Sequence, residues 1–262
     1  MRAVVPAVVF PAPEITLQSF KLFIFCAMPL DSTPNTDFPS QPADCRQCER
    51  LAAFLDAVKT RYPDYHARPV SAFGDCDAQL LIVGLAPGMH GANRTGRPFT
   101  GDYAGILLYQ TLHRFGFASH AESVSRHDDL RLINCRITNA VKCLPPQNKP
   151  NPDEIRRCNH YLQAEIREFA HQGGRALLAL GAIAHQAVLR SLGLRLKDYP
   201  FAHDAEYTLQ DHANGHSDAL KLYDSYHCSR YNTQTRRLTA AMFEQVVARI
   251  AADLSNHIVQ GE

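Results

Sequence analysis

Residues 80–102 read LLIVGLAPGMHGANRTGRPFTGD, and this stretch decides the fold class. Leu80–Val83 is an apolar run typical of a buried strand, and a loop rich in glycine and proline follows it directly. A glycine-rich loop at the carboxyl end of a parallel strand lets backbone N–H groups approach a ligand closely. Because such loops usually carry the site of an open α/β sheet, we expect a binding site at residues 84–102. A wide surface turn is the alternative.

The rest of the chain alternates between strand-like and helix-like patterns. Strands are predicted at residues 80–84, 132–139, 176–180 and 219–226, and helices at 45–58, 103–115, 153–169, 181–192 and 237–254. Strands separated by helices favour a parallel sheet that is covered on both faces. We therefore expect an α/β fold of three layers, α/β/α, with a central four-stranded parallel sheet.

Two segments depart from this alternation. The first 43 residues contain seven prolines, so we expect a disordered tail, or an extension upstream of a true start at Met28. Residues 195–217 are polar and predict an inserted surface loop within a domain that spans 44–255 and precedes a short tail at 256–262. The spacing of the histidines in this loop does not indicate a metal site; they are His203, His212 and His216.

Composition and charge exclude several classes of protein. The net charge is +1, so any contact with nucleic acid must come from local basic loops. No run approaches the roughly 18 apolar residues that a membrane span needs, and the N-terminal apolar piece has no small-residue cleavage pattern. We therefore expect a cytoplasmic protein without a membrane partner.

The cysteines provide a second signal. Without a secretion signal they are not expected to form structural disulfides. Four of them form a pattern, with Cys45 and Cys48 three positions apart and Cys143 and Cys158 fifteen apart. Four thiolates can hold either zinc or a 4Fe–4S cluster, and the spacing alone does not decide between these and buried free thiols. The other four are expected to be structural thiols: Cys26, Cys76, Cys135 and Cys228.

The first loop nearly matches a nucleotide-binding phosphate loop over residues 91–98. However, Arg97 stands where that motif has lysine, and Pro98 replaces the hydroxyl that would hold magnesium. Both changes argue against a nucleotide hydrolase. Phe99 follows directly, and an aromatic ring beside polar donors suits stacking on a nucleobase. A place in the core is the alternative for Phe99.

A third motif, Tyr226–Thr233, follows the last predicted strand. His227 in this motif can donate a hydrogen bond to a developing anion, although an ordinary polar contact is equally compatible with its position. Local positive charge near it suits contact with phosphates; it comes from Arg230, Arg236 and Arg237.

Together these pieces resemble the uracil-DNA glycosylase superfamily, and most closely its family 5 enzymes, from about Cys45 to Leu254. A glutamate stands in family 4 where this chain has Ala86, which points to family 5. The same loop implies that Ala86 and Gly88 line a pocket for the base. The resemblance rests on residues 84–88, 91–102, 137–143, 145–150 and 158–162 and on the loop around His227.

The resemblance implies a monofunctional DNA repair enzyme. Such enzymes flip a deaminated base out of double-stranded DNA and hydrolyse its N-glycosidic bond, leaving an abasic site. Family 5 acts on uracil and also on hypoxanthine and xanthine. The expected cofactor is a structural 4Fe–4S cluster, and the simplest assembly on DNA is a monomer. The cluster ligands that the resemblance implies are Cys45, Cys48, Cys143 and Cys158.

The resemblance also implies roles for individual residues. His227 would donate a hydrogen bond to the oxyanion of the leaving base, Asn139 would read the base edge, and Phe99 would stack on the base. Asn93 would orient the water, although an amide cannot act as a general base. Asp102 is the one carboxylate of the loop, and it could be the base or could fix the loop by hydrogen bonds; the sequence leaves both open.

One motif departs from the family pattern. The family usually has His-Pro-Ser-Pro where this chain has His-Cys228-Ser229-Arg230, so both prolines are missing. We expect Ser229 and Arg230 to contact the DNA backbone, with Arg230 compensating for a freer loop. The departure leaves a second hypothesis, a non-catalytic or weakly active iron–sulfur relative that binds nucleic acid. A zinc-stabilised binding module is a third.

Overall fold

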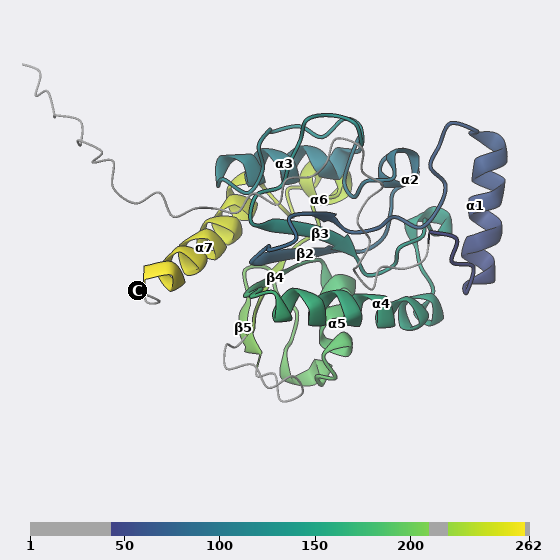
Figure 1. Ribbon diagram of the computed structural model, residues 1–262. Coiled ribbons are helices and arrows are strands. Elements are labelled where there is room, and N and C mark those ends of the chain that lie inside the picture. The colour runs from purple at the N-terminus through teal and green to yellow at the C-terminus, as the bar shows by residue number, and fades with distance from the viewer. Residues whose placement is uncertain (1–42, 210–219, 260–262) are drawn as a thin grey trace, which may run out of the picture. The chain divides into compact units, whose positions relative to one another are not determined.

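The computed structural model describes residues 43–209 and 220–259, with side chains up to residue 256 (Figure 1). Nearly all of the predicted N-terminal tail lies outside these residues, as do Met28, His212, His216 and the last three positions. Within the described ranges, no helix is long and apolar enough to cross a membrane.

A six-stranded sheet forms the centre of the domain, in the order β1-β3-β2-β4-β6-β5. Its four inner strands run parallel, which confirms the predicted central sheet. These strands are β3 (Cys135–Asn139), β2 (Leu80–Gly84), β4 (Ala176–Leu180) and β6 (Leu220–Ser225). The two edge strands are antiparallel to their neighbours and were not predicted; they are β1 (Phe73–Gly74) and β5 (Glu206–Leu209).

Helices cover both faces of this sheet, as Figure 1 shows. The long helices are α1 (Glu49–Arg61), α3 (Tyr103–Arg114), α4 (Pro152–His171), α5 (Ala182–Ser191) and α7 (Ala240–Val259). Two short helices were not predicted: α2 (Ala92–Thr95) and α6 (Arg230–Gln234). The predicted three-layer α/β/α class is therefore confirmed, with α7 running four residues past the expected end of the domain at 255.

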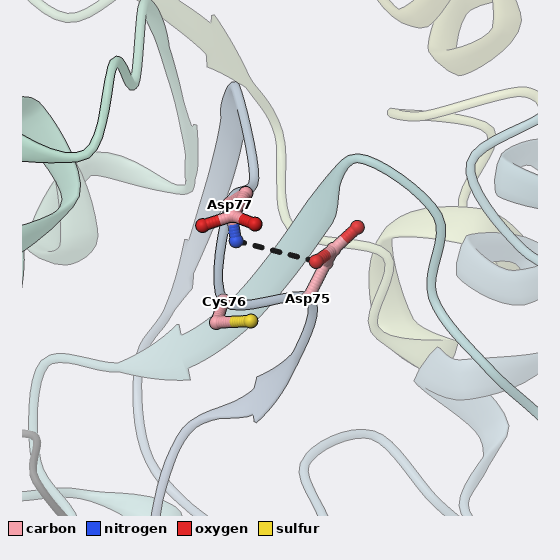
Figure 2. Close-up of side chains that lie close together, drawn as sticks. All are labelled: Asp75, Cys76 and Asp77. Carbon is pink, nitrogen blue, oxygen red and sulfur yellow. Dashed lines mark hydrogen bonds between the residues drawn. The ribbon is translucent and has the colours of Figure 1, made fainter. Parts of the chain in front are cut away.

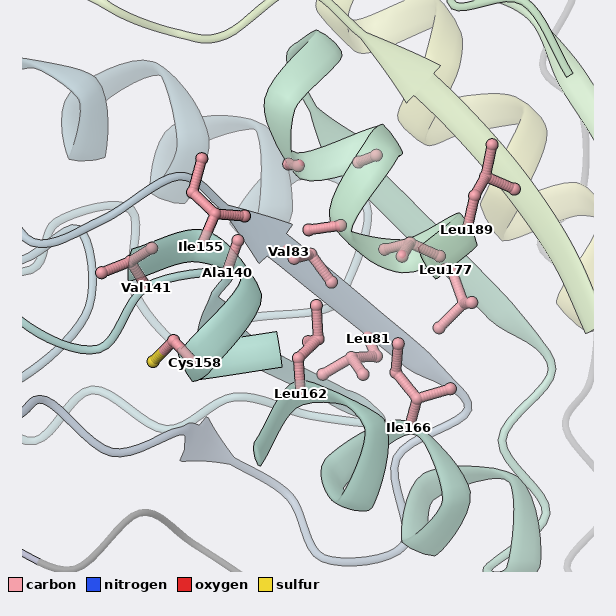
Figure 3. Close-up of a cluster of buried hydrophobic side chains, with 14 of the residues drawn as sticks. Leu81, Val83, Ala140, Val141, Ile155, Cys158, Leu162, Ile166, Leu177 and Leu189 are labelled. Atoms are coloured by element: carbon pink, nitrogen blue, oxygen red, sulfur yellow. The ribbon is translucent and has the colours of Figure 1, made fainter. Parts of the chain in front are cut away.

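Two buried clusters hold the layers together, one on each face of the sheet. Alternate side chains of a strand point to opposite faces, so Leu81 and Val83 of β2 join the cluster with α4 and α5 (Figure 3). Leu80 and Ile82 of the same strand join the cluster with α3 and α7. This two-sided burial explains why β2 is apolar at every position.

The segment predicted as an inserted loop is partly regular. It contains a 3-10 turn, η2 (Leu196–Asp198), and strand β5, which pairs with β6. The expectation of a plain loop was wrong for these residues, because the four residues of β5 are too few to give a clear periodic signal. His203 lies before β5, where its ring stacks on Tyr226 with centroids 5.0 Å apart, which is a packing role.

Candidate active site

The carboxyl ends of β2 and β3 meet where the glycine-rich loop begins. A Cβ atom at Gly84 would lie 2.4 Å from Oδ1 of Asn139 and 2.7 Å from the Phe99 ring. Such distances are too short for any side chain, so glycine is required at this position. The two predicted base-binding residues, Asn139 and Phe99, are thereby brought against the end of β2.

The His227 loop faces Phe99 across the site. The Phe99 and His227 rings stack with centroids 5.8 Å apart at 30°. His227 comes two residues after the end of β6, while Phe99 comes from the loop after β2. The structure therefore brings together two residues that lie 128 positions apart in the chain.

Arg97 fixes the backbone that presents Phe99. Its guanidinium donates to Thr100, Ser123 and Asp128 at 2.9, 2.6 and 2.8 Å, and it is buried. Phe99 has φ +52°, a conformation that non-glycine residues rarely adopt, so it needs such support. Arg97 thus stabilises the loop, in agreement with the prediction that it does not serve a phosphate loop.

Asn93 and Asn139 are buried polar side chains with unpartnered atoms. Asn93 lies in α2 and is fully buried, and both polar atoms of its amide lack a hydrogen-bond partner among the described residues. Oδ1 of Asn139, at the end of β3, is in the same state. An unpartnered buried polar group costs about 1–3 kcal/mol, so these atoms are suited to bind a ligand.

Asp102 has one oxygen committed to the fold. It is the N-cap of α3, where Oδ1 accepts a hydrogen bond from the Gly105 N–H at 2.9 Å. The other oxygen, Oδ2, lies so close to Gly91 that a Cβ there would approach it to 2.2 Å. Burial raises the pKa of this carboxyl group, against backbone hydrogen bonds that lower it. The hydrogen bond to Gly105 shows that Asp102 fixes the loop to the start of α3. The second oxygen, Oδ2, lies beside Gly88 and Gly91.

His227 is held as a neutral imidazole. Burial lowers its pKa to about 4, so the ring carries no charge near neutral pH. Its backbone carbonyl accepts a hydrogen bond from the side chain of Asn232 at 2.9 Å. Asn232 was not among the predicted site residues. Its role depends on the hydrogen bond from α6 to the preceding loop, which no motif reveals.

Ser229 and Arg230 occupy the start of α6. Ser229 is the N-cap, and its hydroxyl accepts a hydrogen bond from the Asn232 N–H at 3.4 Å. Arg230 is exposed, and its guanidinium lies 5.4 Å from the centre of the Tyr103 ring. The two residues therefore lie at the surface beside His227, where a contact with DNA phosphates is sterically open.

Ala86 and Gly88 lie in the same loop but differ in their surroundings. Ala86 packs against the apolar cluster beneath α4 and α5. The Gly88 carbonyl accepts hydrogen bonds from the N–H groups of Asn93 and Gly91 at 3.0 and 3.3 Å. Gly88 therefore supports the wall that carries Asn93, whereas Ala86 packs against a different cluster from the one that contains Phe99.

The four patterned cysteines lie around the start of α4. Cys48 is the N-cap residue of α1, Cys158 lies in α4, and the Sγ of Cys45 is 3.7 Å from the hydroxyl of Tyr161. Burial and, to a lesser extent, the charge of Cys48 raise the pKa of Cys158. Burial and, to a lesser extent, Cys45, Cys143 and Cys158 raise the pKa of Tyr161. The Cys158 sulfur also accepts the Lys142 backbone N–H at 3.4 Å. This sulfur-rich, partly buried set fits a thiolate-bound group.

Four thiolates that bind a single zinc ion stand about 3.8 Å apart. Within the described ranges, the one trio of Cys, His, Asp or Glu side chains whose ligand atoms all lie within 4.8 Å is Asp75, Cys76 and Asp77. No three of the predicted ligand sulfurs approach so closely. Thiolates of a 4Fe–4S cluster bind separate irons, so they stand farther apart.

The trio of Asp75, Cys76 and Asp77 forms a turn between β1 and β2 (Figure 2). Asp75 accepts hydrogen bonds from the N–H groups of Asp77 and Asn134 at 3.2 and 3.1 Å. The Arg136 guanidinium donates to the carbonyls of Asp75 and Cys76. These contacts explain the turn by local structure, and they agree with a structural part for Cys76. Cys135 and Cys228 are buried in the core, as predicted.

Comparison with known proteins agrees with this fold and site. The family model described as the uracil DNA glycosylase superfamily matches residues 71–251. The chain belongs to this superfamily, as the sequence motifs predicted. It is 46% identical over 208 residues to a type-5 uracil-DNA glycosylase of Thermus thermophilus, covering 78% of this chain and 90% of the relative.

Two further relatives agree with the type-5 assignment. A type-5 uracil-DNA glycosylase of Pyrobaculum aerophilum is 38% identical over 221 residues, covering 83% of this chain and 92% of the relative. A type-4 uracil-DNA glycosylase of Thermotoga maritima is 37% identical over 112 residues, covering 42% and 49%. Type-5 relatives thus match over most of the chain and type-4 relatives over less of it.

Proposed function

We propose that this protein is a monofunctional uracil-DNA glycosylase that acts on double-stranded DNA. The observation that carries the proposal is a site beside the stacked rings of Phe99 and His227, in which the buried amides of Asn93 and Asn139 have unpartnered atoms. A flat base with polar edges can stack on Phe99 and complete those hydrogen bonds. Its other substrates are hypoxanthine and xanthine, and it works as a monomer in the cytoplasm.

The leaving base is stabilised as an anion. As the bond between the base nitrogen and C1′ breaks, its electron pair leaves with the base and charge collects on a base oxygen. A neutral His227 retains one ring N–H, which can donate a hydrogen bond to that oxygen. Asn139 can bind the base edge through its amide, which discriminates among bases by donor and acceptor positions.

A water molecule completes the reaction. The water oxygen forms a bond to C1′, on the face from which the nucleobase departs or on the opposite face. A proton of the water must then pass to a proton acceptor. Asn93 can orient the water through its amide, and Oδ2 of Asp102 can accept the proton while Oδ1 keeps capping α3. The raised pKa of Asp102 makes its carboxylate a better proton acceptor than an ordinary aspartate.

We propose that Cys45, Cys48, Cys143 and Cys158 hold a 4Fe–4S cluster with a structural role. When bound, the cluster would join α1, the loop after β3 and the start of α4, because these elements carry the four thiols. Burial raises the pKa of the Cys48 and Cys158 thiols, and the positive charges of Arg157 and Lys142 partly oppose this shift. An anaerobic preparation should be brown and contain iron and sulfide, whereas a colourless preparation with zinc would contradict this proposal.

The decisive test is base excision on defined duplexes. Duplexes with uracil, hypoxanthine or xanthine are incubated with excess enzyme, and abasic sites are revealed by alkaline cleavage. Excision of uracil supports the proposal. DNA binding without excision of any base would instead favour the second hypothesis, a non-catalytic iron–sulfur relative, which is motivated by the missing prolines around Ser229.

A second experiment separates the two roles of Asp102. Asparagine caps helices as well as aspartate does, so Asp102→Asn keeps the cap of α3 and removes the proton acceptor. We expect thermal stability close to that of the parent protein and an excision rate lowered by about 10²–10⁴. An unchanged rate would restrict Asp102 to the loop-fixing role.

A further inference from the structure

Four exposed basic side chains gather around His66, on the outer side of the loop that forms the site. They come from three segments that lie far apart in the sequence, and we call them the His66 surface: Lys59, Arg68, Arg94 and Arg126. The chain as a whole carries a net charge of only +1. A local concentration of positive charge on such a protein indicates an anionic partner.

Contacts with His66 and its neighbours locate Arg94, Arg126 and Lys59. The His66 N–H donates to the carbonyl of Arg94 at 3.0 Å. A Cβ at Gly96 would lie 3.0 Å from the His66 ring and 3.3 Å from the guanidinium of Arg126. The Lys59 ammonium donates to the carbonyl of Tyr65, the residue before His66, at 2.6 Å.

The charges of this surface are not neutralised by the protein. Within the described part of the chain, none of its four side chains forms an ion pair with a carboxylate. In contrast, exposed Arg46, Arg156 and Arg195 elsewhere are each paired with an aspartate. Burial and the nearby cations lower the pKa of His66, so the ring between them stays neutral. Like charges held together without a counter-charge disfavour the folded state.

The surface lies next to the candidate site. Consecutive residues of α2 face opposite ways, since Asn93 is buried in the site wall and Arg94 is exposed. The Arg94 guanidinium also donates to the carbonyl of His90 at 2.7 Å, within the same loop. A DNA strand whose base enters the site would therefore carry its neighbouring phosphates past Arg94.

We propose that the His66 surface binds the phosphates of the DNA duplex that flank the flipped nucleotide. This inference rests on the proposed function for its location, but its test does not require base excision. Each phosphate that a cation neutralises releases counterions, so binding weakens as the salt concentration rises. Removing one such contact lowers the slope of log K against log salt concentration by about 0.9. The surface thus adds to Arg230, the exposed cation beside His227.

The test compares two triple variants with the same change in charge. The first is Lys59→Gln, Arg68→Gln and Arg126→Gln. The matched control changes three exposed basic residues elsewhere: Arg167→Gln on α4, Arg190→Gln on α5 and Lys197→Gln on η2. The dissociation constant for undamaged duplex DNA is measured by fluorescence anisotropy at several potassium chloride concentrations, and thermal melting is recorded for each protein.

We expect the first triple to weaken binding about ten- to a hundredfold near 0.1 M salt and to lower the salt slope by about 2 to 3. Its melting temperature should equal or exceed that of the parent protein, because unpaired like charges are removed. The control triple should match the parent slope. Equal slopes and affinities for the two triples would overturn the proposal, even if uracil excision is demonstrated.

Discussion

Two sets of buried polar side chains lie in or beside the same glycine-rich loop. In one set the hydrogen bonds are formed within the protein, and in the other some polar atoms have no partner. Arg97 donates to Thr100, Ser123 and Asp128. Asn93 and Asn139, which are buried to a similar degree, retain atoms without a partner in the described structure. Burial and residue type alone would not separate these sets.

The difference teaches how to assign a role to a buried polar residue. A fully partnered group stabilises the native fold, and removing it leaves its partners unsatisfied. An unpartnered group lowers stability until a ligand completes it, so its presence indicates binding. Arg97 should therefore affect stability first, and Asn93, Asn139 and the facing His227 should affect excision first.

Among the residues of this comparison, the largest expected effect is on excision and comes from His227→Ala. Loss of a preorganised donor to a developing oxyanion lowers a rate by about 10²–10³. We expect such a fall in the single-turnover rate of uracil excision, with little change in the melting temperature. His113→Ala, at an exposed histidine of α3, is the control and should retain the parent rate. A parent-like rate in His227→Ala would remove this residue from the site.

Arg97→Met tests the partnered set. The substitution keeps much of the side-chain volume but leaves Ser123 and Asp128 without their buried partner, and breaking a buried ion pair costs about 3 kcal/mol or more. Asp128 keeps three backbone donors, so we expect the lower end of that range. Urea denaturation measures the free energy of unfolding. Unchanged stability would place Arg97 with the ligand-binding set.

Asn139→Ala and Asn93→Ala test the unpartnered set. Each removes a buried polar group with unmet hydrogen bonds, so the free energy of unfolding should stay the same or rise. Excision should fall about ten- to a hundredfold, the effect of one hydrogen bond to a group that carries charge. A large loss of stability with normal excision would show that partnership does not distinguish the two sets.

The lowered pKa of His227 provides a further test of the comparison between the two sets. Its pKa is lowered to about 4 in the folded protein, whereas an unfolded histidine titrates near 6.5. As the pH falls from about 6.5 to 4, the unfolded chain binds a proton that folded His227 does not, so this group lowers stability in that window. Between pH 7 and 5, His227→Gln should lose about 2 kcal/mol less stability than the parent protein. Equal losses in urea denaturation would contradict the buried, neutral assignment.

Local patterns predicted the inner strands and the loop, whereas contacts across the fold were beyond them. Leu80–Gly84 is apolar at every position because both faces of β2 are covered, and such runs are recognisable. Strand β1 has two residues and β5 four, too few for a periodic signal. The motifs predicted a site with Phe99, Asn139 and His227, but the part of Arg97 in fixing the loop depends on Asp128, which lies 31 positions away.

The smallest expected effect concerns Asn232, which donates to the His227 carbonyl in the loop where we expect the family motif to have prolines. Asn232→Ala removes one hydrogen bond, of about 1 kcal/mol, so excision should fall about fivefold. Arg230 is the first residue of α6, where proline is favourable, and Ser229 has the extended backbone that precedes proline, φ −63° and ψ 153°. Adding Arg230→Pro to Asn232→Ala should therefore restore part of the rate. Because Arg230→Pro also removes a cation, the rescue is measured with saturating DNA. Failure of the proline to restore any rate would show that Asn232 acts other than by stiffening the loop.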